Sequence, residues 1–155
     1  EVKGIATAAG CQLVASCDLA YASEGSKFAT PGVNIGLFCS TPMVALSRVV
    51  NKKHSMEMLL TGDFINADKA KSIGLINNYF SEDKLVNEIR GMAVKIANKS
   101  SQTLKIGKKA FYNQAEMKIS DAYKYASEIM IKNMMNQVSE EGIAAFLEKR
   151  EPNWS

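Results

Sequence analysis

Three consecutive small residues, Ala8, Ala9 and Gly10, are the part of the sequence with the clearest chemical potential. They follow an apolar stretch typical of a strand and precede a run typical of a helix, so they predict a tight turn into a helix. The first N–H groups of a helix have no intrahelical acceptors, and such groups can hold an oxyanion. The turn is therefore a candidate oxyanion site.

The polar residue next to this turn is Gln12, three positions after Ala9. Proton transfer at that place would need an acid, whereas a glutamine amide can only orient a water molecule or a ligand near neutral pH. Two interpretations stay open. Either the Gln12 side chain faces a substrate, or it makes a hydrogen bond within the fold.

The elements that position these residues belong to an alternation of short strands and short helices over residues 1–80, which predicts an α/β layer. The expected strands are Val2–Ala6, Asp18–Ala22, Lys27–Ala29, Val33–Gly36 and Leu75–Phe80. The expected helices are Ala9–Ser16, Thr41–Val50, Ser55–Leu60 and Asn66–Ser72.

Residues 82–150 are expected to be helical, and a short tail follows the last helix. Apolar residues recur there with the helical period, and we expect the first helix to bury one such stripe: Leu85, Val86, Ile89, Met92, Ala93, Ile96 and Ala97. Three more helices are expected at about Gln102–Glu116, Ser120–Asn136 and Glu140–Glu148. In the third of these four helices, Tyr123, Ala126, Ile129, Met130, Asn133 and Met134 share a face that we expect to pack in a core or a subunit interface.

The composition sets further bounds on function. The chain has 155 residues, of which 46% are hydrophobic, and a net charge of +3. This charge is too small to indicate a nucleic-acid partner, and no apolar run is long enough for a transmembrane helix. The three cysteines, Cys11, Cys17 and Cys39, lack paired spacing and are expected to be buried free thiols in a reducing compartment. We expect no metal site, because the chain has a single histidine and no Cys-x-x-Cys.

Several segments along the chain resemble, in order and spacing, the enoyl-CoA hydratase/isomerase (crotonase) family. They are Val2–Ala6 with Ala9–Leu13 and Cys17-Asp18, Phe28–Pro31 with Gly36, Met56–Gly62, Ala67–Ile76, and Gly142–Arg150 with Pro152 and Trp154. The resemblance implies an α/β fold, the crotonase-like (ClpP/crotonase) spiral of ββα units, over residues 1–80. A C-terminal helical oligomerisation region would follow over residues 81–155. It also implies that this sequence is the C-terminal part of a crotonase, so we expect an N-terminal portion before Glu1.

For activity, the resemblance implies acyl-CoA thioester chemistry. In the family two backbone N–H groups hold the thioester oxygen; one corresponds to Ala9, and the other would lie in the N-terminal portion. The two glutamates of the hydratases correspond to Gln12 and Gly32. Each acid–base group contributes about 10²–10⁴-fold to the rate, so the loss of both predicts weak or lost hydration. No separate cofactor is implied, because CoA is part of the substrate.

The resemblance extends the site to four further residues: Gly10, Cys39, Met130 and Lys149. Met130 and Lys149 fall where the family reaches the adenine end of CoA, and a cationic Lys149 suits a phosphate. Plainer interpretations stay open beside these. Cys39 would then be a packed, inert thiol, Met130 a core or interface residue, and Lys149 a solvated charge.

Two functions follow from the resemblance. The first is an enoyl-CoA hydratase-like protein of fatty-acid metabolism that binds an acyl-CoA thioester with weak or altered activity. If active, it would be a lyase of the enoyl-CoA hydratase/isomerase type. The alternative is a non-catalytic structural subunit of a larger, mitochondrial assembly. In either case the resemblance implies a homotrimer or hexamer and a mitochondrial location.

Overall fold

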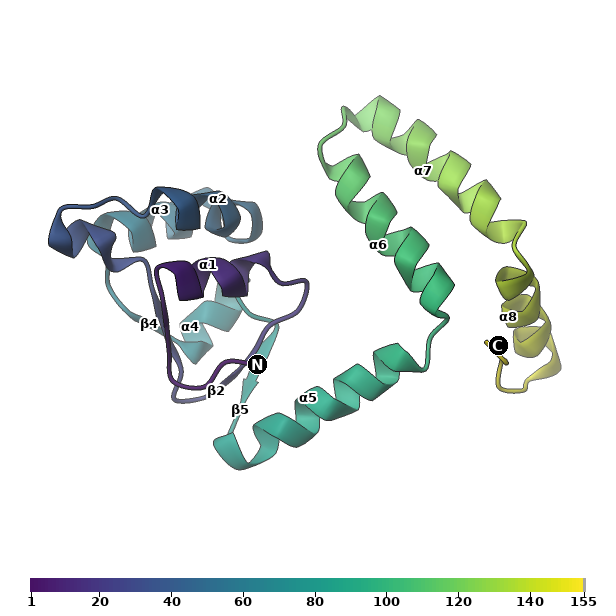
Figure 1. Ribbon diagram of the computed structural model, residues 1–155, viewed down its shortest axis with the longest axis horizontal. Coiled ribbons are helices and arrows are strands. Elements are labelled where there is room, and N and C mark those ends of the chain that lie inside the picture. Colours follow the sequence, from purple (N-terminus) through teal and green to yellow (C-terminus); the bar gives the residue numbers. More distant parts are fainter. Residues whose placement is uncertain (155) are drawn as a thin grey trace. The chain divides into compact units, whose positions relative to one another are not determined.

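The structure is a computed structural model that describes residues 1–154; Ser155, the last residue of the expected helical region, lies outside them. The chain divides into two compact units, Glu1–Met92 and a second that begins at Ala93. Figure 1 labels the elements of both.

The first unit contains two small sheets. β1 (Ile5–Thr7) pairs in parallel with β3 (Lys27–Ala29), which pairs antiparallel with β4 (Ile65–Asn66). β2 (Tyr21–Ser23) pairs in parallel with β5 (Asn78–Phe80). Lys27–Ala29 is as expected, and three other expected strands, Val2–Ala6, Asp18–Ala22 and Leu75–Phe80, are shorter or shifted by one to three residues.

Five helical segments accompany these strands: α1 (Ala9–Ser16), the 3-10 helix η1 (Pro31–Ile35), α2 (Ser40–Val49), α3 (Lys52–Thr61) and α4 (Ala67–Ser72). α1 contacts both β1 and α2, and lies between the strands and helices α2 and α3 (Figure 1). Asparagine side chains fix two helix starts, because Asn51 accepts the His54 N–H and Asn66 accepts the Lys69 N–H.

The core of this unit lies where α1, α2, α3 and α4 meet the strands. Phe28 is 0% exposed, and Leu46 and Leu59 are each 1% exposed. β2 and β3 each contribute one fully buried apolar residue to this core, Ala22 and Phe28. This core holds the start of α1 in place.

The expected strand at Val33–Gly36 is wrong, because η1 occupies these residues. Pro31 stands in the first turn of η1, where its fixed φ suits a helix. Gly36 ends η1 in the left-handed conformation, with φ 75°. The Thr30-Pro31-Gly32 turn signal therefore starts a helical turn rather than a strand.

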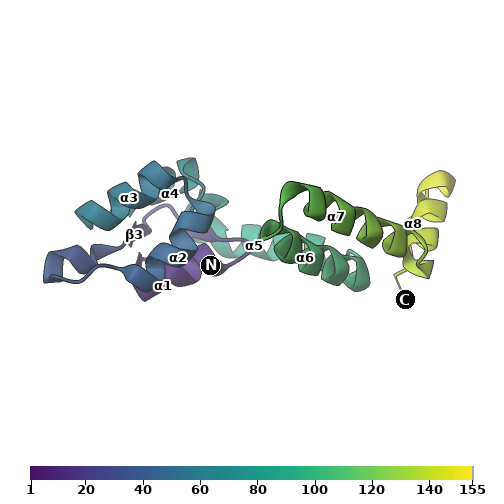
Figure 2. The same ribbon diagram turned by 90° about the horizontal axis from the view of Figure 1, so that it is seen from above.

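The second unit holds α6 (Ser101–Ala115), α7 (Ile119–Met134) and α8 (Gln137–Glu148), and α5 (Glu82–Ala97) enters it from the first unit. α6 and α7 lie side by side as an antiparallel hairpin (Figures 1 and 2). The Ser100 side chain accepts the Thr103 N–H and begins α6, and Asn136 does the same for α8 by accepting the Val138 N–H.

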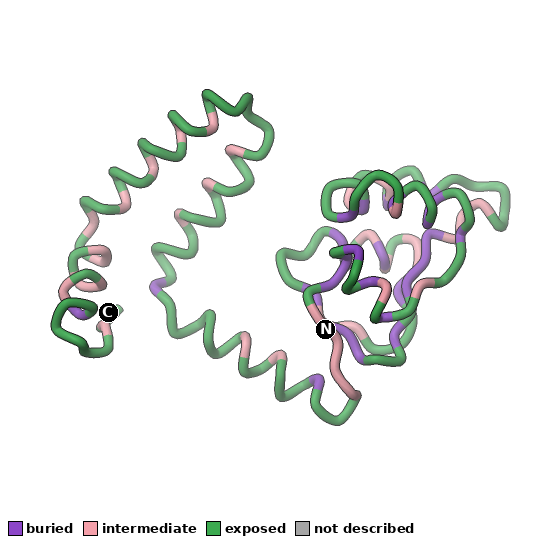
Figure 3. Tube along the Cα trace, turned by 180° about the vertical axis from the view of Figure 1, so that it is seen from behind, coloured by how far each residue is buried: buried purple, intermediate pink, exposed green. Residues whose placement is uncertain are grey.

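The expected burial of the α5 stripe is wrong. Of the seven apolar residues expected inside α5, only Leu85 is buried, and Figure 3 shows mostly exposed residues along α5 to α8. In α7, Tyr123, Met130 and Met134 are 73%, 59% and 57% exposed, so this face is not in a core of the described residues, and its place in a subunit interface stays a prediction. The helical spacing of apolar residues identified the apolar face of each helix, but no other described part of the chain packs over most of these faces.

Among residues 1–154, no helix is both long enough and apolar enough to cross a membrane.

Candidate functional site

The start of α1 is built around an unusual backbone conformation. Ala8 has φ 47° and ψ −112°, a region that L-residues other than glycine rarely adopt. Its N–H donates to the Ala29 carbonyl at 3.0 Å, and its carbonyl accepts the Gln12 N–H at 2.9 Å. The strand before and the helix after therefore hold Ala8 between them.

The first N–H groups of α1 follow directly after Ala8. Those of Ala9, Gly10 and Cys11 have no intrahelical acceptor, and Ala8 supplies no side-chain cap. The helix dipole adds positive potential at the same place. The geometry fits an anionic or strongly polarised oxygen, as the sequence predicts for Ala9 and Gly10.

Gln12 lies on the next turn of α1 and is half-buried. Its carbonyl accepts the Ser16 hydroxyl at 2.8 Å, but within residues 1–154 its side-chain amide has no hydrogen-bond partner. Among these residues the Gln12 amide is thus not engaged, and its role toward a substrate stays a prediction.

Gly32, where the second acid would be needed, is enclosed by the chain itself. Its N–H donates to Cys39 Sγ at 3.3 Å, and its carbonyl accepts the Leu37 N–H at 2.9 Å. A Cβ on Gly32 would lie 2.6 Å from the Leu37 carbonyl oxygen and 2.9 Å from Cys39 Sγ. Any side chain at residue 32 would thus require the backbone to move.

Two further contacts fix η1. The buried Thr30 hydroxyl donates to the Met58 carbonyl at 2.9 Å, which ties the start of η1 to α3. The end of α3 approaches the other side, since a Cβ on Gly62 would meet Val33 Cγ2 at 3.0 Å. The segment that lacks the acid is therefore firmly held, and its shape depends on glycine.

Cys39 and Cys11 are packed thiols. Both are buried, and burial raises the pKa of Cys11 to about 11, with a smaller contribution from the neighbouring Cys39. A thiol with so high a pKa is a poor nucleophile. This argument applies to Cys11; for Cys39 the structure shows a buried thiol that accepts the Gly32 N–H, and its role stays a prediction. The expected burial of Cys17 is wrong, because Cys17 is exposed.

The structure brings most of the predicted residues of the first unit into one region. The start of α1 is tied to Ala29 at the end of β3, and Cys11 of α1 lies close to Cys39, which contacts Gly32. Met130 and Lys149 belong to the second unit, where both are exposed. That Met130 and Lys149 share a ligand site with Ala9 stays a prediction.

Sequence reasoning missed two features of the site. One is the strained backbone of Ala8. A glycine at this position would have indicated a positive φ, whereas an alanine gives no such indication. The other is the Leu37 carbonyl that closes the space beside Gly32, and no residue type predicts a backbone atom. Among the described residues no group of three or more His, Cys, Asp or Glu could hold a metal ion.

The profile of the enoyl-CoA hydratase/isomerase family matches residues 1–155. The chain belongs to this family. Enoyl-CoA hydratase domain-containing protein 3, mitochondrial, of Xenopus laevis is 50% identical over 155 residues, which are 100% of this chain and 53% of the relative. Enoyl-CoA hydratase, mitochondrial, of Pongo abelii is 34% identical over 99% of this chain and 53% of the relative.

Solved structures of the same family share the fold. An enoyl-CoA hydratase of Mycobacterium smegmatis is 52% identical with a TM-score of 0.96, over 99% of this chain and 60% of that chain. Human enoyl Coenzyme A hydratase domain-containing protein 3 is 50% identical with a TM-score of 0.95, and the match covers 97% of this chain and 60% of that chain. The chain thus has a crotonase-like α/β fold and spans about half the length of the curated relatives it matches.

Proposed function

We propose that this crotonase-family chain binds an acyl-CoA thioester of fatty-acid metabolism in mitochondria and hydrates enoyl-CoA weakly or not at all. The observation that carries the proposal is the start of α1, where the N–H groups of Ala9 and Gly10 are free of intrahelical acceptors beside the Gln12 amide. One such donor lowers a barrier by about 2.7–4 kcal/mol when it faces a developing oxyanion. Because CoA is part of the substrate, no further cofactor is proposed.

The proposed loss of hydration activity rests on residues 12 and 32, which lack a carboxylate for different reasons. Gln12 retains a polar head that can orient a water or a carbonyl but cannot transfer a proton near neutral pH. Gly32 has no side chain, and the Leu37 carbonyl and Cys39 Sγ take the space where one would start. Each missing acid–base group costs about 10²–10⁴-fold in rate.

The test uses full-length protein with crotonyl-CoA, followed at the absorbance of the enoyl thioester, and titration with butyryl-CoA, which cannot be hydrated. We expect saturable butyryl-CoA binding with little turnover of crotonyl-CoA. Hydration at the rate of a glutamate-bearing hydratase would contradict the proposal. Absence of saturable binding would instead favour the non-catalytic structural subunit.

The Gln12→Glu variant separates the two positions. We expect it to bind butyryl-CoA as the parent does and to gain little hydration, because residue 32 still supplies no acid. A gain of about 100-fold or more would show that a single carboxylate suffices, and would place the defect at Gln12 alone.

We also propose that the helical region mediates a homotrimer or hexamer. Its exposed apolar residues support this, since contiguous exposed apolar surface usually marks an interface: Val94, Ile131, Met134, Met135, Phe146 and Leu147. Light scattering on full-length protein should give a mass of three or six subunits. A monodisperse monomer at micromolar concentration would contradict this.

A further inference from the structure

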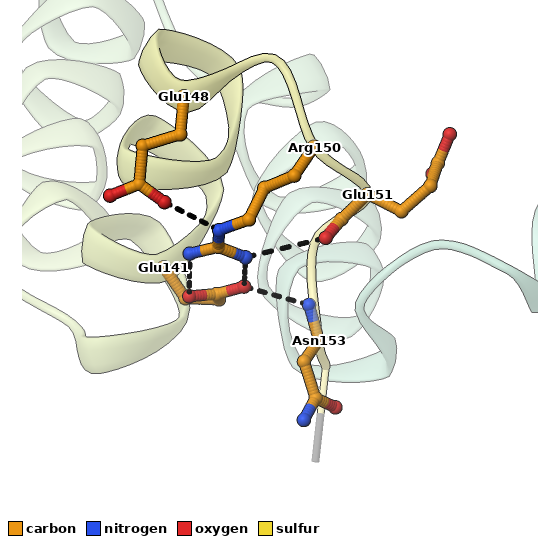
Figure 4. Close-up of polar contacts among 5 residues, drawn as sticks. All are labelled: Glu141, Glu148, Arg150, Glu151 and Asn153. Atoms are coloured by element: carbon orange, nitrogen blue, oxygen red, sulfur yellow. Dashed lines mark hydrogen bonds and ion pairs between the residues drawn. The ribbon is translucent and has the colours of Figure 1, made fainter.

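The residues after α8 turn back along that helix. Lys149 adopts the left-handed conformation, with φ 55° and ψ 40°, and so reverses the chain. The next residue, Arg150, donates its N–H to the Ala145 carbonyl at 3.0 Å. Figure 4 shows the returning segment beside the helix.

The Arg150 side chain holds this segment to α8. Its Nη1 and Nη2 donate to the two carboxylate oxygens of Glu141 at 2.6 and 2.9 Å, and its Nε donates to Glu148 Oε2 at 2.6 Å (Figure 4). Glu141 also accepts the Asn153 N–H at 2.7 Å. A two-pronged guanidinium–carboxylate pair is among the stronger and better oriented polar contacts. Glu141 thus binds the returning chain at two places.

Trp154 marks the far end of the same segment. Its Nε1–H donates to the Asn98 carbonyl at 3.0 Å, at the end of the helix that enters this unit. Its ring lies against Gly142 of α8, where an added Cβ would stand 3.2 Å from the ring carbon Cη2. The bare backbone of Gly142 therefore lets the ring lie close to the helix.

The Trp154 ring also forms one wall of an open groove of about 380 Å³. The other walls include Met134 of α7 and Ile143 and Phe146 of α8, and none of the lining residues is charged. Without Trp154 the groove would lose this wall, and the apolar side chains beside it would be more exposed.

We propose that Arg150–Trp154 form a releasable strap, in which the Glu141–Arg150 pair keeps the Trp154 ring on Gly142 and closes one side of the groove. The strap can open while α6, α7 and α8 stay folded, because the contacts described above join it to α8 and to Asn98 after α5, and its ion pair is partly exposed to water. This inference is independent of acyl-CoA binding.

The test reads Trp154 directly, since it is the only tryptophan of the sequence. Acrylamide quenching and emission wavelength are measured on the full chain and on Glu141→Gln. We expect the open fraction to rise about fivefold, the change that corresponds to loss of one exposed, well-oriented ion pair. Glu151→Gln is the matched control, because the structure uses only the carbonyl of Glu151.

A second pair of variants keeps the test decisive if Glu141→Gln folds poorly. Both Gly142→Ala in α8 and Gly107→Ala in α6 raise the helix propensity of their segments. The new Cβ at residue 142 would displace the Trp154 ring, whereas the new Cβ at residue 107 would have no atom within 4 Å. We expect quenching to rise in Gly142→Ala and not in Gly107→Ala. Unchanged quenching in Glu141→Gln with helix content retained overturns the proposal. So does a rise in Gly142→Ala alone, since the ion pair would then not hold the ring.

Discussion

The two units of this chain are held together in different ways. In the α/β unit, Phe28, Leu46 and Leu59 are almost completely buried, and polar contacts mainly shape the turns around them. In the helical unit, Ala145 and Ser100 are the only buried residues among those described. Its helices are held by a hairpin and by helix caps, and the contacts of Arg150 and Trp154 hold the segment that follows α8.

The difference explains why the candidate site lies where it does. A strained residue such as Ala8 persists only where its surroundings determine its conformation, and the core under α1 does so. The helical unit has no comparable core, so its exposed apolar faces suit a partner surface better than a strained catalytic turn. The predictions below test this contrast.

The largest expected effect is a core truncation. Phe28→Ala should lower the free energy of unfolding of the α/β unit by about 3–5 kcal/mol, because it removes a fully buried ring. Ile119→Ala in the helical unit should change stability by less than about 0.5 kcal/mol, since Ile119 is 77% exposed and is not among the residues proposed for the subunit interface. Urea unfolding followed by circular dichroism measures both. Equal losses would remove the contrast between the units.

The next effect tests the enclosed glycine of η1. Gly32→Ala should cost about 1–3 kcal/mol, because its Cβ would collide with the Leu37 carbonyl oxygen and Cys39 Sγ. Gly25→Ala is the control, since its Cβ would meet nothing within 4 Å. Adding Cys39→Gly to Gly32→Ala should recover part of the loss. If Gly32→Ala is as stable as Gly25→Ala, the space beside residue 32 is not closed.

A smaller effect of opposite sign is expected at the start of α1. Ala8→Gly should stabilise the protein by about 1 kcal/mol, because glycine adopts a positive φ without strain. Ala9→Gly should destabilise it by up to about 1 kcal/mol, because Ala9 has ordinary helical geometry. Thermal unfolding of the two variants gives the comparison. A loss of stability in Ala8→Gly would argue against strain at this turn.

These effects also show how far the sequence predicts the structure. Ala9–Ser16 and Lys27–Ala29 match residue for residue, because a small-residue turn and an apolar alternation are local signals. The prediction that the apolar stripe of α5 is buried was wrong, because a helical period shows which face is apolar but not what covers that face. The enclosure of Gly32 depends on the carbonyl of Leu37, so only the tertiary structure reveals it.

The smallest expected effect is a titration in the helical unit. The Arg150 side chain, followed by the Asn153 N–H, lowers the pKa of Glu141 to about 2 from its ordinary 4.5. A carboxyl whose pKa is lowered on folding stabilises the fold above its ordinary pKa, and this contribution is lost as the pH falls through about 2. Arg150→Met should return the Glu141 pKa toward 4.5, as measured by NMR of its side-chain carboxyl carbon.

Lys149→Met is the matched control for this titration, because it removes the adjacent cation and leaves the guanidinium pair in place. We expect the Glu141 pKa to stay near 2 in this variant. The pair formed with Arg150, rather than the general positive charge of the segment, would then be what lowers it. If both variants raise the Glu141 pKa equally, diffuse positive charge rather than one oriented pair holds the segment after α8.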